Sequence, residues 1–231
     1  MDREEGMEIL RNGEWLSATP AEFQEAILSR CEWGHLEAGA LIQQGGEDEG
    51  ELIGLAHGII EMRTILGRAD TPIMHFAHAV FWFGFAPVIY GRCRPLAASA
   101  RTSIWIARVP RPALTALLAA RPEGWRHFVQ PLLLYGNTTV TIAADLLIRD
   151  SERRCGAVLL RLGGRRLAGP EDAASTQVPI TQRELAGATN LSLNSAGTMV
   201  QRLKARGLID LGYREITIRA PDALRAFVDQ E

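Results

Sequence analysis

Apolar residues in the last third of the chain recur with the period of an α-helix. Four of them stand at positions i, i+3, i+4 and i+7, namely Ala196, Met199, Val200 and Leu203. This spacing puts them on one stripe and predicts an amphipathic helix that packs by that stripe. Ser192 offers a side-chain oxygen to cap the start of the helix. Gly207 is suited to end it, so a helix is predicted within residues 192–206.

A shorter helix is predicted just before this one. Thr181 and Glu184 form the Thr-x-x-Glu pattern of a capping box, in which each side chain satisfies a backbone donor at the helix start. The turn between the helices contains Asn190, which adopts left-handed backbone conformations at modest cost. Farther on, apolar residues within 208–211 and 215–219 flank a Gly-Tyr-Arg turn and predict a hairpin. Together these elements predict a winged helix-turn-helix over residues 180–218, with DNA as its partner.

The second helix also has a polar face, which carries Asn194, Thr198 and Gln201 at i, i+4 and i+7. Small polar side chains can read base edges in the major groove, whereas Arg and Lys contact phosphates. The competing interpretations are an ordinary solvated helix face and a surface for a protein partner. The candidate DNA-binding residues are Thr181, Gln182, Ser192, Leu193, Asn194, Ser195, Thr198, Gln201, Arg202 and Lys204.

A long helix is predicted over residues 123–149. Its candidate seam recurs at alternating spacings of four and three, the repeat of a two-stranded coiled coil: Phe128, Leu132, Tyr135, Thr139, Ile142 and Leu146. Pro131 and Gly136 weaken this prediction, and the β-branched run 138–142 suits a strand on propensity alone. We expect a helix because the stripe continues through residues 143–147. Another helix, capped by Ser151, is predicted over 152–162, and a loop over 168–178.

Residues 36–109 alternate short apolar runs with glycine-containing turns, a pattern typical of an antiparallel sandwich or roll. Residues 36–42 hold apolar runs broken by Gly39, and strands are predicted within 51–55, 59–62 and 104–107. Pro112 opens a short helix over 113–118. The predicted fold class is therefore α+β. It combines an N-terminal antiparallel β-roll (1–122), a long dimerisation helix (123–150) and a C-terminal winged helix-turn-helix domain (151–231).

Composition narrows the class of protein. A chain of 231 residues with 47% hydrophobic and 23% charged residues is typical of a globular protein. The absence of an apolar run of ~18 residues predicts no membrane span, and the acidic residues 2–5 do not resemble a signal peptide. Cys31, Cys93 and Cys155 are scattered without metal-binding spacing. We therefore expect reduced thiols in a cytoplasmic protein.

Charge is distributed unevenly along the chain, whose overall net charge is −2. Residues 1–150 hold 13 Lys and Arg against 18 Asp and Glu, a net charge of −5. Residues 151–231 hold 12 against 9, a net charge of +3. This asymmetry is expected of a basic DNA-binding domain joined to an acidic domain with another role.

The order of an acidic roll, a long helix and a winged helix resembles the Crp/Fnr family of bacterial transcription regulators, to which the cyclic AMP receptor protein belongs. The resemblance spans residues 15–228 and is strongest over 180–218 and at Pro221-Asp222-Ala223-Leu224-Arg225. Phe81-Trp82-Phe83-Gly84 is similar to the family's aromatic-Gly turn between roll strands, and Val109-Pro110-Arg111 to its exit from the roll. The resemblance implies a parallel homodimer on a roughly palindromic double-stranded operator and admits RNA polymerase as a further partner. No catalytic motif suggests an enzyme.

The resemblance weakens at the effector site. Cyclic-nucleotide binders of this family carry Gly-Glu after the aromatic residue and, farther on, Arg followed by Ser or Thr. Here Phe85 follows Gly84, and Pro95 follows Arg94. Thr139 falls where the family's long helix touches the base. The candidate effector residues Gly84, Phe85, Arg94 and Thr139 thus lack the ribose-binding carboxylate and the phosphate-binding hydroxyl. We expect the roll to sense another ligand or none.

Two readings of this region stay open. Arg94 also fits a solvated surface position, and the aromatic run 74–85 either lines an apolar pocket or fills the roll. The alternative function is a metal- or haem-binding roll, as sensor or enzyme, that uses His57, His75 and His78 with Glu61. Their spacing is not a known ligand pattern. We therefore expect no metal, haem or cyclic nucleotide as cofactor.

The recognition helix departs from the family as well. Members that read a TGTGA-type half-site carry Arg, Glu and Arg where this chain has Leu193, Asn194 and Thr198. Loss of both Arg removes guanine contacts that are each worth ~1–3 kcal/mol of discrimination. Asn194 can pair with adenine instead, and Leu193 and Thr198 can touch a thymine methyl group. We expect a different operator, richer in A·T pairs.

Overall fold

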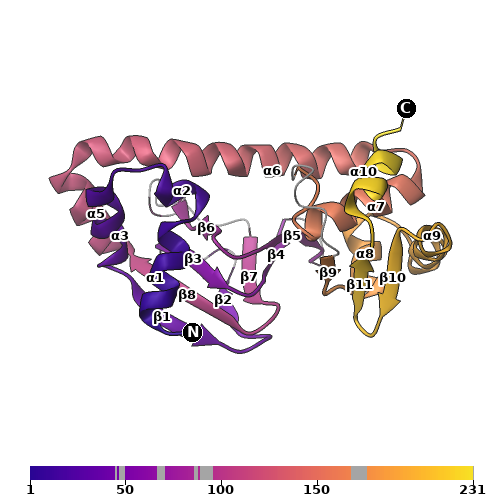
Figure 1. Ribbon diagram of the computed structural model, residues 1–231, viewed down its shortest axis with the longest axis horizontal. Coiled ribbons are helices and arrows are strands. Elements are labelled where there is room, and N and C mark those ends of the chain that lie inside the picture. Colours follow the sequence, from indigo (N-terminus) through magenta and orange to yellow (C-terminus); the bar gives the residue numbers. More distant parts are fainter. Residues whose placement is uncertain are drawn as a thin grey trace. The chain divides into compact units, whose positions relative to one another are not determined.

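The computed structural model describes residues 1–44, 46, 50–66, 71–85, 88, 96–167 and 176–230 (Figure 1). The described residues fall into two compact units. We call residues 1–69 with 77–137 the roll unit, and residues 70–76 with 138–231 the reader unit. The expected α+β class is confirmed. The division into three segments at residues 122 and 150 stays a prediction, since the boundary between the two compact units falls inside the long helix.

Three helices that we did not predict open the roll unit. They are α1 (Arg3–Arg11), α2 (Glu14–Ser17) and α3 (Ala21–Leu28). The Asp2 side chain caps α1 by accepting a hydrogen bond from the backbone N–H of Glu5 at 2.9 Å. Such a cap three residues before an acidic residue is a recognisable helix start, and it was the available sequence signal. The helices bury large apolar side chains, among them Leu10, Leu16 and Ile27.

Two antiparallel sheets form the roll, as predicted. The first has the order β1 (Glu32–Leu36), β8 (Ile104–Pro110), β3 (Glu51–His57) and β6 (Trp82–Phe83). The second has the order β2 (Leu41–Gln43), β7 (Leu96–Ala100), β4 (Ile60–Thr64) and β5 (Ile73–Ala77). The apolar runs that Gly39 breaks within residues 36–42 fall on two different strands. β1 ends at Leu36, and a turn with Gly39 at a φ of 88° precedes β2.

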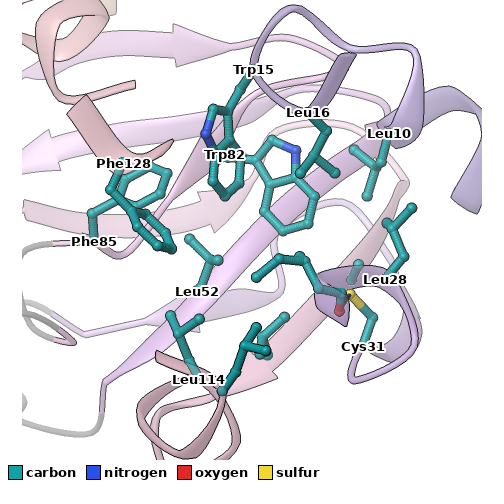
Figure 2. Close-up of a cluster of buried hydrophobic side chains, with 14 of the residues drawn as sticks. Leu10, Trp15, Leu16, Leu28, Cys31, Leu52, Trp82, Phe85, Leu114 and Phe128 are labelled. Atoms are coloured by element: carbon teal, nitrogen blue, oxygen red, sulfur yellow. Dashed lines mark hydrogen bonds between the residues drawn. The ribbon is translucent and has the colours of Figure 1, made fainter. Parts of the chain in front are cut away.

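A hydrophobic core joins the first sheet to the N-terminal helices (Figure 2). Leu52 of β3 and Trp82 of β6 meet Trp15 and Leu16 from the helical side of this core. Cys31 also belongs to it, and burial raises the pKa of its thiol to about 12. A second cluster lies on β2, β3, β4, β7 and β8 and includes Ile53, Ile60 and Ile106. Apolar burial of this kind stabilises the roll by ~1.5–3 kcal/mol for each large side chain, before the opposing loss of conformational entropy.

The long helix begins later than predicted. After α5 (Arg111–Ala120), residues Pro122–Phe128 form a 3₁₀ helix, η1, and α6 spans Val129–Leu147. Pro131 therefore lies in the first turn of α6, where the N–H that proline lacks has no intrahelical partner to lose. Two residues of the predicted seam make contacts within their own chain. Phe128 is buried in the core of its own chain, and the Tyr135 hydroxyl donates to the Trp82 carbonyl at 2.9 Å.

The reader unit continues with α7 (Ser151–Leu162), β9 (Thr176–Val178), α8 (Gln182–Ala188), α9 (Leu193–Ala205), β10 (Ile209–Gly212), β11 (Glu215–Ile218) and α10 (Pro221–Val228). Its three-stranded sheet has the order β10-β11-β9. Two predictions need correction here. Asp150, rather than Ser151, caps α7 by accepting from the backbone N–H of Arg153 at 2.8 Å. Of the loop predicted over 168–178, residues 168–175 lie outside the described part of the chain, and residues 176–178 form a strand that pairs with β11.

No helix in the described part of the chain is long and apolar enough to cross a membrane.

Candidate nucleic-acid interface

The turn between α8 and α9 is built as the sequence predicts. The Thr181 hydroxyl oxygen accepts from the backbone N–H of Glu184 at 3.2 Å, and the backbone N–H of Thr181 donates to Glu184 Oε2 at 2.8 Å. This completes the capping box. Asn190 takes the left-handed conformation, with a φ of 54°. Local hydrogen bonds therefore fix where α8 begins and where the chain turns toward α9.

α9 is held by its apolar stripe. Ala196, Val200 and Leu203 are fully buried, and Met199 is half-buried. Ser192 caps the helix by accepting from the backbone N–H of Ser195 at 3.1 Å. Gly207, with a φ of 72°, follows its end. At the same end, Arg206 donates to Glu152 Oε1 at 2.6 Å, which anchors α9 to α7. The opposite face of α9 is thereby left toward solvent.

That face forms an open hollow with the start of α8. Six of the ten predicted DNA-binding residues line it, together with Gly197 and Ala205: Gln182, Leu193, Asn194, Thr198, Gln201 and Arg202. Side chains from two helices thus converge on one surface. A Cβ added to Gly197 would lie 3.5 Å from Gln182 Oε1, an ordinary van der Waals distance, so the start of α8 lies close to this face of α9.

The other four predicted residues have different places. Thr181 and Ser192 serve as helix caps, and the Ser195 hydroxyl is hydrogen-bonded to that of Ser192 at 2.8 Å. Lys204 is exposed on α9 but does not line the hollow. Hydroxyl groups at helix starts and an exposed lysine are groups that contact phosphates in protein–DNA complexes. Such contacts fix the position of the protein on the duplex but do not read its sequence.

Within the hollow, the chemistry is mainly that of amides and methyl groups. Asn194 and Gln201 are exposed and offer both donors and acceptors. The Thr198 hydroxyl donates to the Asn194 carbonyl at 3.0 Å, which leaves its methyl group and acceptor capacity for a ligand. Leu193 is an apolar side chain with 41% of its surface exposed. These four side chains suit the adenine edge and the thymine methyl group better than guanine, whereas Arg202, which lines the same hollow, carries the cation that can meet guanine or a phosphate.

Sequence reasoning passed over three exposed residues of the same domain. Arg183 lies on α8, and Tyr213 and Arg214 form the tip of the β10–β11 hairpin. Tyr213 is 91% exposed, and Arg214 has a φ of 58°, which is uncommon for a non-glycine residue. The available signal was an aromatic and a cationic residue inside a turn that otherwise favours Gly and Asn.

The predicted effector residues do not form a described site. Gly84 has a φ of 95°, and a Cβ there would lie 1.9 Å from the Glu51 carbonyl oxygen, so only glycine fits. Phe85 is 2% exposed. Its ring centroid lies 5.4 Å from that of Trp15 and 5.6 Å from that of Phe128. Figure 2 shows Phe85 beside Phe128 among the packed side chains of the core.

The other two members of the predicted site lie elsewhere. Thr139 is an exposed residue of α6 in the reader unit, and Arg94 lies outside the described residues. Of the two readings of the aromatic run, packing describes Phe85: its ring fills the core rather than lining an open space.

The alternative of a metal or haem site at His57, His75 and His78 is not supported by a cluster of ligands in the described residues. Among the residues that the structure describes, no group of three or more His, Cys, Asp and Glu side chains is placed to hold a metal ion. Glu61, the carboxylate invoked with the histidines, is engaged by other groups. Its Oε1 accepts from Arg63 Nε at 2.8 Å and from the Ser99 hydroxyl at 3.1 Å, and its Oε2 accepts from Arg101 at 2.9 Å.

An antiparallel roll followed by a long helix and a winged helix-turn-helix is the fold of Crp/Fnr-like transcription regulators. Residues 153–227 match the family model of the Crp-like helix-turn-helix domain, which places this part of the chain in that family. The chain as a whole has the fold of the Crp/Fnr regulators, and the resemblance seen in the sequence is confirmed. No curated protein sequence matches the chain.

Solved structures share this fold at low sequence identity. A cyclic nucleotide binding protein proposed for Ruegeria pomeroyi is 19% identical, with a TM-score of 0.67 and 100% of each chain covered. The c-di-GMP responsive global regulator CLP of Xanthomonas campestris is 18% identical, with a TM-score of 0.67, and the match covers 86% of this chain and 99% of that one. A Crp/Fnr-family transcriptional regulator of Thermus thermophilus is 21% identical, with a TM-score of 0.63 and coverages of 86% and 99%.

Proposed function

We propose that this protein is a homodimeric transcription regulator that binds a roughly palindromic operator in double-stranded DNA through α9. The observation that carries the proposal is the hollow over α8 and α9, in which six predicted reading residues converge. It lies within the segment that matches the Crp-like helix-turn-helix model. In this class the second helix of the motif enters the major groove, and two copies read half-sites ~34 Å apart.

The exposed face of α6 supports the dimer. Its most exposed apolar residues are Val129, Leu133, Val140 and Leu147, with exposed fractions of 54%, 64%, 68% and 80%. With Gly136 and Ala143 between them, they repeat at alternating spacings of four and three, one position later than the predicted seam. A continuous apolar stripe on a solvent-facing helix is costly in a monomer. We infer that a second copy of α6 covers it.

The roll is proposed to sense a ligand other than a cyclic nucleotide, or none. Phe85 occupies the position of the ribose-binding carboxylate and is packed between Trp15 and Phe128, so it offers neither charge nor space to a ribose hydroxyl. A metal- or haem-binding roll has weaker support, because Glu61 is engaged by Arg63 and Arg101. We propose a regulator without metal, haem or catalytic activity that acts on DNA in the cytoplasm.

The reading residues indicate the base composition of the operator. With Leu193, Asn194 and Thr198 at the reading positions, the contacts available are an amide, a hydroxyl and methyl groups. An amide pairs best with adenine, and apolar groups meet the thymine methyl group. We therefore propose half-sites richer in A·T pairs than TGTGA.

Selection from random DNA tests the proposal. The purified protein is incubated with a random duplex library, and bound duplexes are recovered, amplified and sequenced. We expect a two-fold related pair of half-sites one helical turn apart, ~10–10.5 base pairs between centres. Recovery of TGTGA-type half-sites would overturn the proposed base preference. Binding that falls steeply with salt and favours no sequence would overturn specific reading, because phosphate contacts alone behave that way.

A further inference from the structure

A buried carboxylate near the C-terminal end of α6 is the centre of a charge cluster in the reader unit. The Asp145 side chain is 0% exposed, although it lies two residues before the end of the helix. Asp and Glu are almost never fully buried unless they are paired. The groups around Asp145 must therefore compensate its charge, and they show which elements this carboxylate connects.

Two guanidinium groups pair with this carboxylate. Arg161 of α7, itself 4% exposed, donates from Nε to Asp145 Oδ2 at 2.9 Å. Arg166 donates from Nε to Asp145 Oδ1 at 3.1 Å, and a second nitrogen of Arg166 donates to Asp229 Oδ1 at 2.9 Å, at the end of α10. Arg161 also donates to the carbonyl oxygen of Met74. We call Asp145, Arg161, Arg166 and Asp229 the Asp145 cluster.

The cluster is balanced and directional. Two cations face two carboxylates, and both oxygens of Asp145 accept a hydrogen bond. Burial lowers the pKa of the Arg161 guanidinium, and the adjacent Asp145 carboxylate opposes that effect. A guanidinium donates in fixed directions in one plane, so rotation of α7 against α6 breaks these bonds rather than stretching them. Few other arrangements of α6, α7 and α10 would keep the buried charges paired.

An independent set of bonds ties the same junction to the DNA-reading motif. Arg154 of α7 donates from Nε to the Thr189 carbonyl at 3.0 Å, in the turn between α8 and α9. Another nitrogen of Arg154 donates to the Ile148 carbonyl at 2.6 Å, just after α6. One side chain thus bridges the end of the long helix and the turn before α9.

We propose that Asp145, with Arg161 and Arg166, is a positioning residue that sets α9 at one angle to α6, and thereby sets the half-site spacing that the dimer accepts. The inference rests on the proposed function, because spacing has meaning only for two readers joined through α6. The cluster does not touch DNA. By fixing α9 relative to α6 in each protomer, it fixes the separation of the two copies of α9 in the dimer. The second half-site is then bound at high effective concentration only when its spacing matches that separation.

The test compares spacing preference with half-site recognition. Duplexes carry the half-sites recovered by selection, with their centres moved together or apart one base pair at a time, and a further duplex carries a single half-site. For the wild-type chain we expect affinity to fall about tenfold or more within two base pairs of the optimum, because the second contact is lost. For Asp145→Asn we expect that fall to shrink to about threefold or less, since a mobile reader accepts several spacings.

Single half-site affinity separates positioning from folding. It should stay within about twofold of wild type in Asp145→Asn, the range of an ordinary surface substitution. Asp222→Asn is the matched control, because it removes an exposed i,i+3 pair with Arg225 in the same unit. It should keep the wild-type spacing profile. If Asp145→Asn does not fold, the double variant Asp145→Leu with Arg161→Met takes its place, since apolar residues of similar volume often replace a buried ion pair without loss of stability.

The outcomes separate the two proposals. A folded, dimeric cluster variant with the wild-type spacing profile overturns the positioning role and leaves the proposed function intact. A wild-type chain that binds single and paired half-sites equally overturns the proposed dimeric function, and the inference with it. A flattened spacing profile with unchanged single half-site affinity supports the inference.

Discussion

The helix-turn-helix and the aromatic core of the roll differ in how far along the chain their contacts reach. The capping box joins Thr181 to Glu184, three residues away, and Ser192 caps α9 through Ser195, also three residues away. Phe85, in contrast, packs on Trp15 and Phe128, at distant points of the sequence. The first region is assembled from local rules that leave one helix face open. The second is assembled by packing between distant parts of the sequence, which buries the ring of Phe85.

This difference separates two kinds of candidate functional residue. Asn194, Thr198 and Gln201 can change without disturbing the stripe that holds α9, so their identity is free to follow the operator. Phe85 cannot change in that way. It is a candidate effector residue, but its side chain is also part of the core. A substitution should therefore alter recognition in the first region and stability in the second.

Loss of the dimer should disable DNA binding most strongly, while the helices of the reader unit stay intact. Val140→Glu places a charge in the exposed apolar stripe of α6, and we expect it to shift the protein to a monomer. Operator affinity should then fall roughly a hundredfold or more, because the second half-site no longer adds to the first. Analytical ultracentrifugation and binding to the selected operator measure the two effects.

Leu41→Glu is the control for this change, since Leu41 is an exposed apolar residue outside α6, with 61% of its surface exposed against 68% for Val140. It should remain dimeric and bind normally. A Val140→Glu variant that is still a dimer would place the interface on another surface.

Truncation of Phe85 tests the other side of the comparison. Phe85→Ala should lower the free energy of unfolding of the roll by about 3–5 kcal/mol, the usual cost of deleting a buried aromatic ring. Chemical denaturation followed by tryptophan fluorescence suits the measurement, because Trp15 contacts the ring. Leu41→Ala, at an exposed site, should change stability by no more than about 0.5 kcal/mol. A loss below about 1 kcal/mol for Phe85→Ala would show that the ring borders a space rather than filling the core.

Removal of the reading side chains of α9 should change DNA recognition without changing stability. The double variant Thr198→Ala, Gln201→Ala should lose about 1–3 kcal/mol of discrimination between the selected operator and a scrambled duplex, because base contacts carry that share. Stability and dimerisation should be unchanged, since both residues line the hollow rather than the buried stripe. Competition binding at fixed salt gives the discrimination. Equal affinity of variant and wild type for the operator would mean that other residues read it.

The same contrast explains what could be predicted from sequence. The helix-turn-helix was found residue by residue, because caps, the left-handed Asn190 and the spacing of the stripe are local signals. The predicted seam of α6 included Phe128 and Tyr135, because the heptad pattern cannot reveal that both residues are used by the core of their own chain. The Asp145 cluster left no signal at all, since its members come together only after α6, α7 and α10 have packed.

The smallest expected effect concerns the most local interaction. Thr181→Ala removes the hydroxyl that accepts from the backbone N–H of Glu184, and it should lower the free energy of unfolding of the reader unit by about 1 kcal/mol, the usual value of an N-cap. Thr181→Ser keeps the hydroxyl and should restore most of that stability, which identifies the cap rather than the lost methyl group as the cause. Thermal unfolding compares the three proteins. Because the loss is local, unfolding of the roll should be unaffected. Operator affinity should fall only to the extent that the first turn of α8 unfolds. A loss of several kcal/mol that serine does not restore would mean that packing of Thr181, rather than its local hydrogen bond, stabilises this end of the motif, as packing stabilises the roll.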